Sequence, residues 1–313
     1  RGINVWCAAS GGLLTTHSVI SVLKTSGVEV LVDHRQLIMP QLAATGVEAN
    51  RLEEKTGWKI VWGPVYASDI PAFLQNELLK TVEMRQVRFP WRQRLEMAAS
   101  WAFPISMLVT LIAILTWSGG LLPLVFLTWA LAVWLFISFP LYHSWLGTYG
   151  KKIGPIFVDF GLIGLQFFLW CLIILSLAVY AALVQTFSWS FIIHWGGISL
   201  LLILILGIDL TGSTPTFKSG LHEDRWLKLI LDVDQCGGDG SCIQVCPRNC
   251  FNLNSEETLV SIPQAEQCVQ CGACIVQCPW DALYFTTPGG DVIAADTVRR
   301  FKLNLMGQRV VRS

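Results

Sequence analysis

Residues 268–279 read Cys-Val-Gln-Cys-Gly-Ala-Cys-Ile-Val-Gln-Cys-Pro. Three cysteines recur at every third position, and a fourth, Cys278, is followed directly by proline. This is the ligand spacing of a bacterial-type iron–sulfur cluster, because the short loops let three thiolates wrap one corner of a cube. The alternatives are a zinc site or two disulfides, but zinc favours two separated cysteine pairs over a compact triplet. The run therefore predicts an iron–sulfur cluster of the 4Fe–4S kind.

A second, altered copy of the motif stands upstream. Residues 236–247 read Cys-Gly-Gly-Asp-Gly-Ser-Cys-Ile-Gln-Val-Cys-Pro, so Asp239 occupies the place of the second cysteine. Two such copies predict an α+β ferredoxin domain of bacterial type that holds two clusters. A carboxylate is a harder donor than a thiolate, so we expect a labile corner at Asp239. The cluster there is either 4Fe–4S with an oxygen ligand or 3Fe–4S with that corner missing.

The two motifs are expected to exchange their last ligands. In two-cluster ferredoxins the fourth cysteine of each motif binds the cluster of the other motif. The predicted metal ligands are Cys268, Cys271, Cys274 and Cys246 for one cluster, and Cys236, Asp239, Cys242 and Cys278 for the other. Cys250 is left over, and it is either a substitute ligand, a thiol that handles metal, or a buried apolar residue.

The composition points to a membrane protein that works in a reducing compartment. Of the 313 residues 53% are hydrophobic and 14% charged, which is too apolar for an ordinary soluble domain. The formal net charge is zero, which argues against nucleic acid as a partner. Eight of the ten cysteines lie between 236 and 278, where the clusters use seven of them, so a disulfide framework is not indicated. Oxygen-sensitive clusters suggest the cytoplasm.

An all-α transmembrane domain is predicted over residues 97–211. A helical span needs about twenty apolar residues. Four stretches qualify: residues 98–117, 121–141, 156–184 and 190–210. The third stretch is long enough to be broken, which leaves five crossings as the alternative to four.

The distribution of basic residues predicts the orientation of these spans. Basic residues precede the first stretch, lie between the second and third, and follow the fourth, whereas the other two connections carry no charge. They are Arg85, Arg88, Arg92, Arg94, Lys151, Lys152, Lys218, Arg225 and Lys228. Cytoplasmic loops are enriched in Lys and Arg. We therefore predict a multi-pass protein of the cell (inner) membrane, in contact with membrane lipid, with both soluble parts facing the cytoplasm.

The first ninety residues alternate between strand and helix patterns. Strands are predicted over residues 3–6, 28–33 and 58–62, and helices over 15–25, 47–56 and 69–80. This alternation predicts an α/β domain with a parallel sheet. Because the chain begins with Arg1 and its first residues look like a core strand, we expect a preceding N-terminal segment.

Cys7 directly follows the first predicted strand and precedes a run of small residues, 8–12. In parallel α/β sheets ligands gather beyond the carboxyl ends of the strands. A glycine-rich turn at this place suggests phosphate binding, but the Gly-x-Gly-x-x-Gly and Gly-Lys-Ser/Thr patterns of nucleotide sites are absent. A large planar cofactor pressed against the backbone would also require small side chains. A buried core thiol is the alternative role for Cys7.

The segment Asn4-Val5-Trp6-Cys7-Ala8-Ala9 resembles the signature of the corrinoid protein of anaerobic mercury methylation. Residues 34–35, 40–42, 63–65, 69–74, 84–90 and 211–213 are also similar to that family. Residues 236–290, including Thr-Pro-Gly-Gly at 287–290, resemble its ferredoxin partner. The chain thus looks like a fusion of two proteins that are usually separate.

This resemblance implies a Rossmann-like corrinoid-binding domain in which residues 4–9 contact the cofactor, a cobalamin-type corrinoid. It implies that Cys7 is the catalytic residue and the lower axial ligand of cobalt. A thiolate there loads electron density onto the opposite bond, which favours release of methyl as a carbanion equivalent. The acceptor would be thiol-bound Hg(II) or another soft electrophile. A methyl-donor protein and an external electron donor are the further partners, and the fused ferredoxin would re-reduce the cobalt.

The chain departs from the family pattern at three places. Ser10-Gly11-Gly12 stands where the family has Gly-Lys, and Asp291 stands where its ferredoxin has a further cysteine. The chain ends Arg309-Val-Val-Arg-Ser313, without the terminal cysteine pair that is thought to relay mercury. These differences weaken mercury as the native acceptor more than they weaken the corrinoid chemistry.

The sequence therefore predicts a multi-domain, membrane-anchored corrinoid-dependent methyltransferase. The predicted parts are an incomplete corrinoid-binding α/β domain over residues 1–92, the transmembrane domain over 97–211, a linker over 212–230, and the ferredoxin domain with its tail over 231–313. Two functions remain as alternatives. One is a corrinoid methyl carrier for another acceptor, and the other is a membrane electron-transfer subunit without methyl transfer, in which Cys7 has no role.

Overall fold

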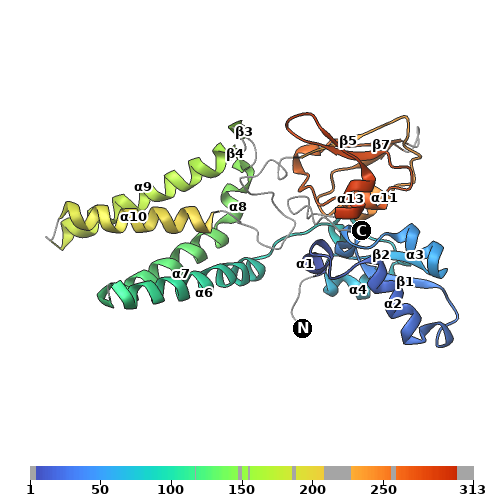
Figure 1. Ribbon diagram of the computed structural model, residues 1–313, viewed down its shortest axis with the longest axis horizontal. Helices are drawn as coiled ribbons and strands as arrows, with labels where there is room; N and C mark the ends of the chain where they lie inside the picture. The colour runs from blue at the N-terminus through green and yellow to red at the C-terminus, as the bar shows by residue number, and fades with distance from the viewer. Residues whose placement is uncertain are drawn as a thin grey trace. The chain divides into compact units, whose positions relative to one another are not determined.

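The computed structural model describes residues 5–116, 118–146, 150–153, 156–184, 188–207, 227–254 and 259–301. These residues form two compact units (Figure 1). The first unit combines the residues up to Arg88 with the described residues from 227 onward. The second begins at Phe89, and its described residues end at 207.

A small parallel sheet organises the N-terminal part of the first unit. Strand β1 (Gln36–Pro40) pairs in parallel with β2 (Lys59–Gly63), and Met39 stands opposite Trp62. The crossover between them holds the 3₁₀ helix η2 (Gln41–Thr45) and helix α3 (Ala49–Thr56). A parallel pair requires such a crossover, because a tight hairpin cannot join strands that run in the same direction.

Short helices complete this part. Helix α1 (Val5–Ser10) is followed by α2 (Thr16–Ser26), which starts at a capping box between Thr15 and Ser18. The others are the 3₁₀ helices η1 (Val28–Val30) and η3 (Ala67–Asp69) and the helices α4 (Ile70–Gln75) and α5 (Val82–Arg85).

The predicted elements of this part are confirmed in some places and wrong in others. The helices expected over 15–25 and 47–56 are α2 and α3, and the strand expected over 58–62 is β2. The strand predicted over residues 3–6 is wrong where it is described, because Val5 and Trp6 begin α1. The strand predicted over 28–33 is also wrong; it begins with η1, and β1, which was not predicted, takes the place beside β2.

Two of these errors have identifiable causes. Val30 and Leu31 are mostly exposed, so this segment has no neighbouring strand to pack against. Strand propensity alone does not form a strand without such a partner. The helix expected over 69–80 ends early, at Gln75. Glu77 and Leu78 adopt left-handed φ values of 51° and 64°, which cannot continue a right-handed helix.

The C-terminal part of the first unit has the α+β arrangement expected of a ferredoxin. Strands β5 (Lys228–Leu231), β8 (Leu283–Thr286) and β9 (Val292–Ile293) form an antiparallel sheet. Strands β6 (Asn252–Asn254) and β7 (Leu259–Ser261) form a separate antiparallel pair. The helical elements are α11 (Ser241–Val245), the 3₁₀ helix η7 (Ala265–Gln267), α12 (Ala273–Gln277) and α13 (Ala295–Phe301).

The two cluster motifs fold alike. Helix α11 follows Gly240 and helix α12 follows Gly272, and both glycines are left-handed, at φ 73° and 70°. A left-handed position of this kind suits glycine, which has no β-carbon. Each helix then ends at a Cys-Pro pair, at Cys246 and Cys278. The sequence repeat is therefore a structural repeat.

The second unit consists mainly of long apolar helices. They are α6 (Trp91–Thr116), α7 (Leu121–Ile137), α9 (Phe160–Leu183) and α10 (Trp189–Leu206). The 3₁₀ helix η4 (Ser118–Gly120) joins α6 to α7, and α8 (Phe139–Tyr142) and the 3₁₀ helix η5 (His143–Trp145) follow α7. Strands β3 (Gly150–Ile153) and β4 (Ile156–Asp159) pair in an antiparallel manner before α9.

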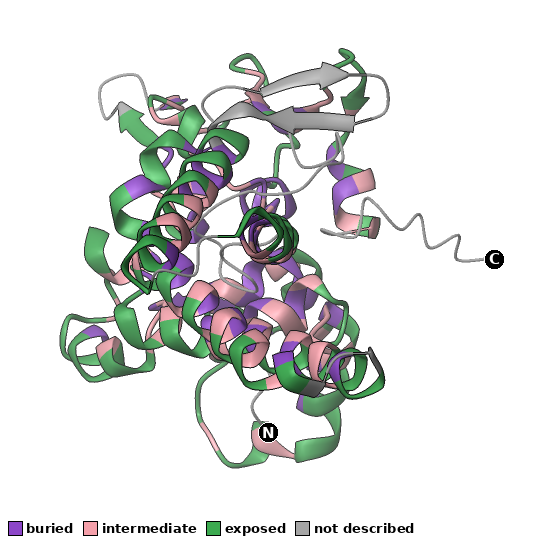
Figure 2. Ribbon diagram, turned by 90° about the vertical axis from the view of Figure 1, so that its left-hand side faces the viewer, coloured by how far each residue is buried: buried purple, intermediate pink, exposed green. Residues whose placement is uncertain are grey.

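These helices have the properties of membrane spans. Three helical segments, Trp91–Leu115, Leu162–Leu183 and Trp189–Leu206, are long and apolar enough to cross a membrane. The pair Leu121–Ile137 and Phe139–Trp145, bent by 55°, makes a fourth if it counts as one span. Figure 2 shows exposed residues along large parts of these helices. Leu115, Leu122 and Phe126 are among the exposed apolar side chains. Such apolar exposure suits contact with lipid.

The third predicted span needs a correction at its start. It was expected from residue 156, but residues 156–159 form β4 and the helix begins at Phe160. Helix α9 then runs unbroken to Leu183, so the described residues give no break of the kind that five crossings would need.

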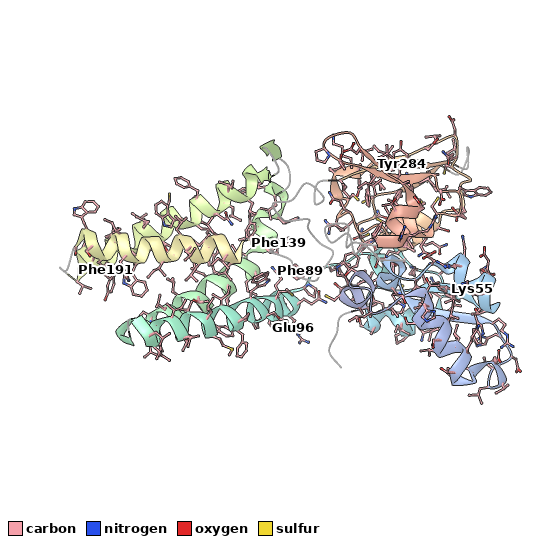
Figure 3. All side chains as sticks on the ribbon, viewed as in Figure 1. Lys55, Phe89, Glu96, Phe139, Phe191 and Tyr284 are labelled. Carbon is pink, nitrogen blue, oxygen red and sulfur yellow. The ribbon has the colours of Figure 1, made fainter. Side chains whose placement is uncertain are left out.

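Contacts inside the second unit hold neighbouring segments together. Phe89 packs edge-on against Phe139, with ring centroids 5.5 Å apart, as Figure 3 shows. The indole nitrogen of Trp170 on α9 donates a 2.8 Å hydrogen bond to the carbonyl oxygen of Gly196 on α10. A β-carbon at position 196 would lie 2.5 Å from Cδ1 of Ile174, so a larger residue there would force the end of that side chain to move.

Candidate functional site

The first thiol group surrounds a cavity in the ferredoxin part of the chain. Cys246, Cys268, Cys271 and Cys274, which are the predicted ligands of one cluster, line it together with Cys250. Apolar side chains such as Leu229 and Phe251 complete the wall. Cys246 and Cys274 are buried, and Cys268 and Cys271 are half-buried.

The thiols of this group lie close enough together to affect one another's ionisation. The pKa values of Cys271 and Cys274 are raised, first by burial and then by the neighbouring thiols, Cys246 and Cys268 among them. Thiols that resist ionisation when packed together are stabilised as thiolates by a cationic metal group. The donor set is therefore one that an iron–sulfur cluster fits.

Cys250 belongs to this first group, which the sequence did not settle. Its backbone N–H donates to the Cys246 sulfur at 3.3 Å. Its buried thiol lies beside those of Cys246 and Cys268, and this proximity raises the pKa of Cys250 and lowers that of Cys246. Cys250 is therefore a neighbour of two predicted ligands. The short spacing from Cys246 to Cys250 was the available sequence signal.

The second group gathers around Cys242. The pKa of Cys242 is raised to about 12, first by burial and then by the charges of Asp239, Cys278 and Cys236. These are the four residues predicted for the other cluster. Cys242 and Cys278 are buried, whereas Asp239 is exposed and Cys236 half-buried. This group therefore has one open corner, at Asp239.

The structure thus brings together the members of each predicted ligand set, and their role as ligands remains a prediction. Among the residues that the structure describes, no three His, Cys, Asp or Glu side chains stand close enough to hold a single metal ion. Ligands of a cubane cluster stand farther apart, because the iron and sulfide core lies between them.

Cys7 lies on helix α1, so its predicted place at the end of a strand is wrong. Trp6 and Ala9, three positions apart on one face of the helix, are buried, and Ala9 is fully covered. The Cys7 side chain is half-buried, as are Val5 and Ala8. The first of the predicted cofactor contacts, Asn4, lies outside the described residues.

The backbone around α1 is packed tightly. Helix α1 packs against η2. A β-carbon at Gly46 would lie only 2.8 Å from the carbonyl oxygen of Ala9, so position 46 accepts no side chain at this approach. Buried Trp6 and Ala9 and the close approach at Gly46 thus fix the helix, while the Cys7 side chain stays half-buried.

Comparisons with known proteins match the two ends of the first unit. A family model described as CO dehydrogenase/acetyl-CoA synthase delta subunit matches residues 1–74. A second one, described as a 4Fe-4S binding domain, matches residues 263–284. Residues 75–262 lie outside both matches, including the motif with Asp239.

Curated relatives match the same N-terminal part. The acetyl-CoA decarbonylase/synthase complex subunit gamma of Methanopyrus kandleri is 34% identical over 82 residues, which are 26% of this chain and 17% of that protein. The corresponding subunit of Archaeoglobus fulgidus is 34% identical over 76 residues, 24% of this chain and 16% of that protein. This chain therefore spans about a sixth of the length of the curated relatives it matches. No solved structure matches it.

Proposed function

We propose that this chain is a membrane-anchored methyl-transfer protein that binds a corrinoid through Cys7 and carries its own iron–sulfur reductant. The observation that carries the proposal is the half-buried Cys7 thiol on α1, inside the segment that matches the delta-subunit model. The 4Fe-4S match at residues 263–284 supports the reductant. The apolar helices of the second unit support the membrane anchor.

A bound corrinoid would supply a cobalt centre that accepts a methyl group and gives it up again. The residues present fit such a group, because a soft thiolate is a strong donor to a transition metal. Cys7 is the proposed donor, and buried Trp6 and Ala9 fix the helix that presents it. Small side chains at positions 8–12 leave room for a large planar group beside the backbone.

The reductant is proposed to be two clusters. Cys246, Cys268, Cys271 and Cys274 would hold one cluster, and Cys236, Asp239, Cys242 and Cys278 would hold the other. Fusion to the corrinoid-binding part gives these clusters a high effective concentration, on the order of mM for short flexible linkers. An external electron donor and a methyl-donor protein would serve the chain from outside.

Thiol-bound Hg(II) is the proposed methyl acceptor, because the run Asn4-Val-Trp-Cys-Ala8 resembles that of the mercury-methylating corrinoid protein. A second candidate is methyl transfer to another acceptor, such as a one-carbon carrier or another soft electrophile. The relatives favour this second candidate, since they are subunits of acetyl-CoA decarbonylase/synthase complexes.

The decisive experiment compares two cysteine variants of the full chain under anaerobic conditions. Cobalamin is added, and the absorption band of thiolate-bound cobalt is recorded. Methyl transfer from methylcobalamin to thiol-complexed Hg(II) is then measured as methylmercury. Cys7→Ala should lose the band and the transfer and keep its cluster spectra. Cys171→Ala, at an exposed position of α9, is the matched control and should keep all three.

The outcomes separate the candidates. A chain that binds no cobalamin would leave only the electron-transfer alternative. A chain that binds it through Cys7 and produces no methylmercury would support the carrier for another acceptor.

A further inference from the structure

One glutamine connects the ferredoxin part to the N-terminal part of the first unit. The side-chain amide of Gln277 donates hydrogen bonds to the carbonyl oxygens of Ala44 at 2.7 Å and Val47 at 2.6 Å. Its side-chain oxygen accepts a 3.1 Å hydrogen bond from the backbone N–H of Ala49. Gln277 is 5% exposed, so these three bonds are shielded from water.

The position of Gln277 in its helix explains this contact. Gln277 is the last residue of α12 and lies between the predicted ligands Cys274 and Cys278. Residues four apart share one face of a helix, so Ala273 lies on the same face as Gln277. By the same spacing, Cys274 and Cys278 lie together on a different face. Ala273 is buried in the hydrophobic cluster of the N-terminal part, whereas Cys274 and Cys278 belong to the ferredoxin core.

The shared core continues around this helix. Val245 of α11 is also buried in the N-terminal cluster, which includes Val19, Ala43 and Leu52. Cys271 packs against that cluster as well. Of the predicted ligands in the described part of the chain, only Cys271 packs against it. The first ligand set is thus the one that touches the N-terminal core.

Two further residues of the N-terminal part, Lys80 and Val87, bond to the ferredoxin part. The Lys80 ammonium donates to the Gln41 side chain at 2.8 Å and to the carbonyl oxygen of Gln244 at 2.7 Å. The backbone N–H of Val87 donates to the carbonyl oxygen of Pro247 at 3.1 Å. The contact between the two parts therefore combines apolar packing with directional hydrogen bonds, as specific interfaces do.

The segment that receives these bonds also supports Cys7. Gln277 bonds to Ala44 at the end of η2 and to Val47 and Ala49 just after it. Helix α1 packs on the same η2. One layer of backbone therefore separates the cluster helix α12 from the helix that carries Cys7.

We propose that Gln277 is a positioning residue that locks the ferredoxin part onto η2, and so holds the cluster of the Cys271 set at a fixed place beside α1. Its part in re-reducing a corrinoid rests on the proposed function, whereas the lock itself does not. A side-chain amide is suited to this task, because its NH₂ group supplies two donors and its oxygen supplies an acceptor. Losing the amide leaves two buried carbonyl groups and one N–H without partners.

The test uses the full chain with its clusters and two matched variants. Gln277→Leu removes all three bonds at nearly constant size, and Gln270→Leu is the control. Gln270 is also buried between cluster cysteines and donates a 2.8 Å hydrogen bond to Leu227, inside the ferredoxin part. Hydrogen–deuterium exchange is followed in the peptide that contains Ala49. Cluster absorption reports whether each variant is folded.

In the Gln277→Leu variant the amide hydrogen of Ala49 should exchange at least tenfold faster than in the wild type. In the Gln270→Leu variant the exchange rate of Ala49 should equal that of the wild type. If Gln277→Leu loses its clusters, Gln277→Glu decides, because it keeps an acceptor for Ala49 and loses the donors. Exchange over residues 44–49 should then still be faster than in the wild type, because the bonds to the carbonyl oxygens of Ala44 and Val47 are lost. Unchanged exchange over residues 44–49 in the folded Gln277 variant would overturn the lock.

A second arm of the experiment examines the role of Gln277 in the reduction of cobalt by the clusters. Protein with reduced clusters, freed of reductant, is mixed with cobalamin, and each electron that leaves a cluster reduces one cobalt by one unit. Gln277→Leu should slow this reaction at least tenfold, while Gln270→Leu should not. If the wild-type chain binds no cobalamin, the proposed function fails and the exchange arm still decides the lock. Rapid reduction in a Gln277 variant with fast exchange would overturn the positioning role.

Discussion

The hydroxyl of Ser241 donates a hydrogen bond to one carboxylate oxygen of Asp239, at the place where the second cysteine of a cluster motif belongs. The bond engages the oxygen Oδ2, and Asp239 itself is exposed. A hard, solvent-exposed ligand binds iron more weakly than a thiolate does. We therefore expect iron at this corner to be the first that the protein loses.

Asp239→Cys tests this expectation. The variant should hold four irons in the second cluster and release iron to a chelator roughly tenfold more slowly, since a thiolate replaces an oxygen donor. Iron analysis and EPR before and after chelation provide the measurement. Ser241→Ala, which removes only the hydrogen bond, is the control for a change near the site. Two identical all-thiolate EPR signals from the wild-type protein would refute a carboxylate ligand.

The stability of the first unit should depend on pH through Lys80. Burial, and to a smaller extent the charge of Arg85, lower the pKa of Lys80 from 10.5 to about 7 in the folded chain. Between these values the unfolded chain binds more protons than the folded one, so the free energy of unfolding rises with pH. Below pH 7 both states are protonated and the contribution is constant. Denaturant titrations at pH 6, 7, 8 and 9 measure the slope.

Lys80→Met should flatten this pH dependence, because it removes the titrating group and keeps the apolar stem. Lys55→Met, at an exposed position of α3, is the control for loss of a surface charge. A Lys80→Met protein whose stability still rises as steeply from pH 7 to pH 9 would show that another group is responsible.

Arg248 should tune the potential of one cluster. It follows Cys246 and Pro247, and its Nε is buried without a hydrogen-bond partner. Burial lowers the pKa of Arg248, and the nearby thiols of Cys250 and Cys246 counteract this. A positive charge beside a cluster favours the reduced, more negative state. Arg248→Gln should therefore shift the potential of the Cys246 cluster by on the order of 50 mV to more negative values.

Arg299→Gln provides the matched control for that measurement. Arg299 donates a 2.8 Å hydrogen bond to the carbonyl oxygen of Cys278, in the other ligand set, and also pairs with Asp281. EPR redox titrations should show that each variant shifts its own cluster. A shift of the same cluster by both substitutions would contradict the crossed ligand sets.

Sequence is most informative where local chemistry determines the outcome. The cysteine spacing predicted two ligand sets, and the structure brings the members of each set together, because short loops fix the distances between thiols. Their role as ligands stays a prediction. Helix α3 and strand β2 follow from periodicity and from the stop at Gly57. The strand predicted over 28–33 did not form, because β1 occupies the place beside β2 where it would have paired.

Long-range partners could not be predicted in this way. Gln277 reads as an ordinary polar residue inside a cluster motif, and its hydrogen-bond partners lie more than two hundred residues earlier in the chain. The helix of Cys7 was missed for a related reason. Residues 3–6 have strand propensity, but Trp6 and Ala9 are buried only when the segment is helical.

The first unit also limits the number of membrane crossings. Residues before and after the membrane helices share one buried core, with Val245 and Ala273 packed among residues of the N-terminal part. In a chain whose long helices cross a membrane, we therefore expect both parts on the same side, which requires an even number of crossings. Three long helices alone would separate them, so the bent pair Leu121–Ile137 and Phe139–Trp145 is expected to cross as one span.

Cysteine labelling tests this expectation of four crossings. In a Cys171→Ala background, a membrane-impermeant maleimide added to intact spheroplasts should label Ser188→Cys, which precedes α10. It should label Lys151→Cys, in strand β3, only after the membrane is opened, because Lys and Arg are retained on the cytoplasmic side. Labelling of Lys151→Cys from outside would mean that the bent pair returns to the side it entered from. The two parts of the first unit would then lie on opposite sides of the membrane, and their shared core could not form.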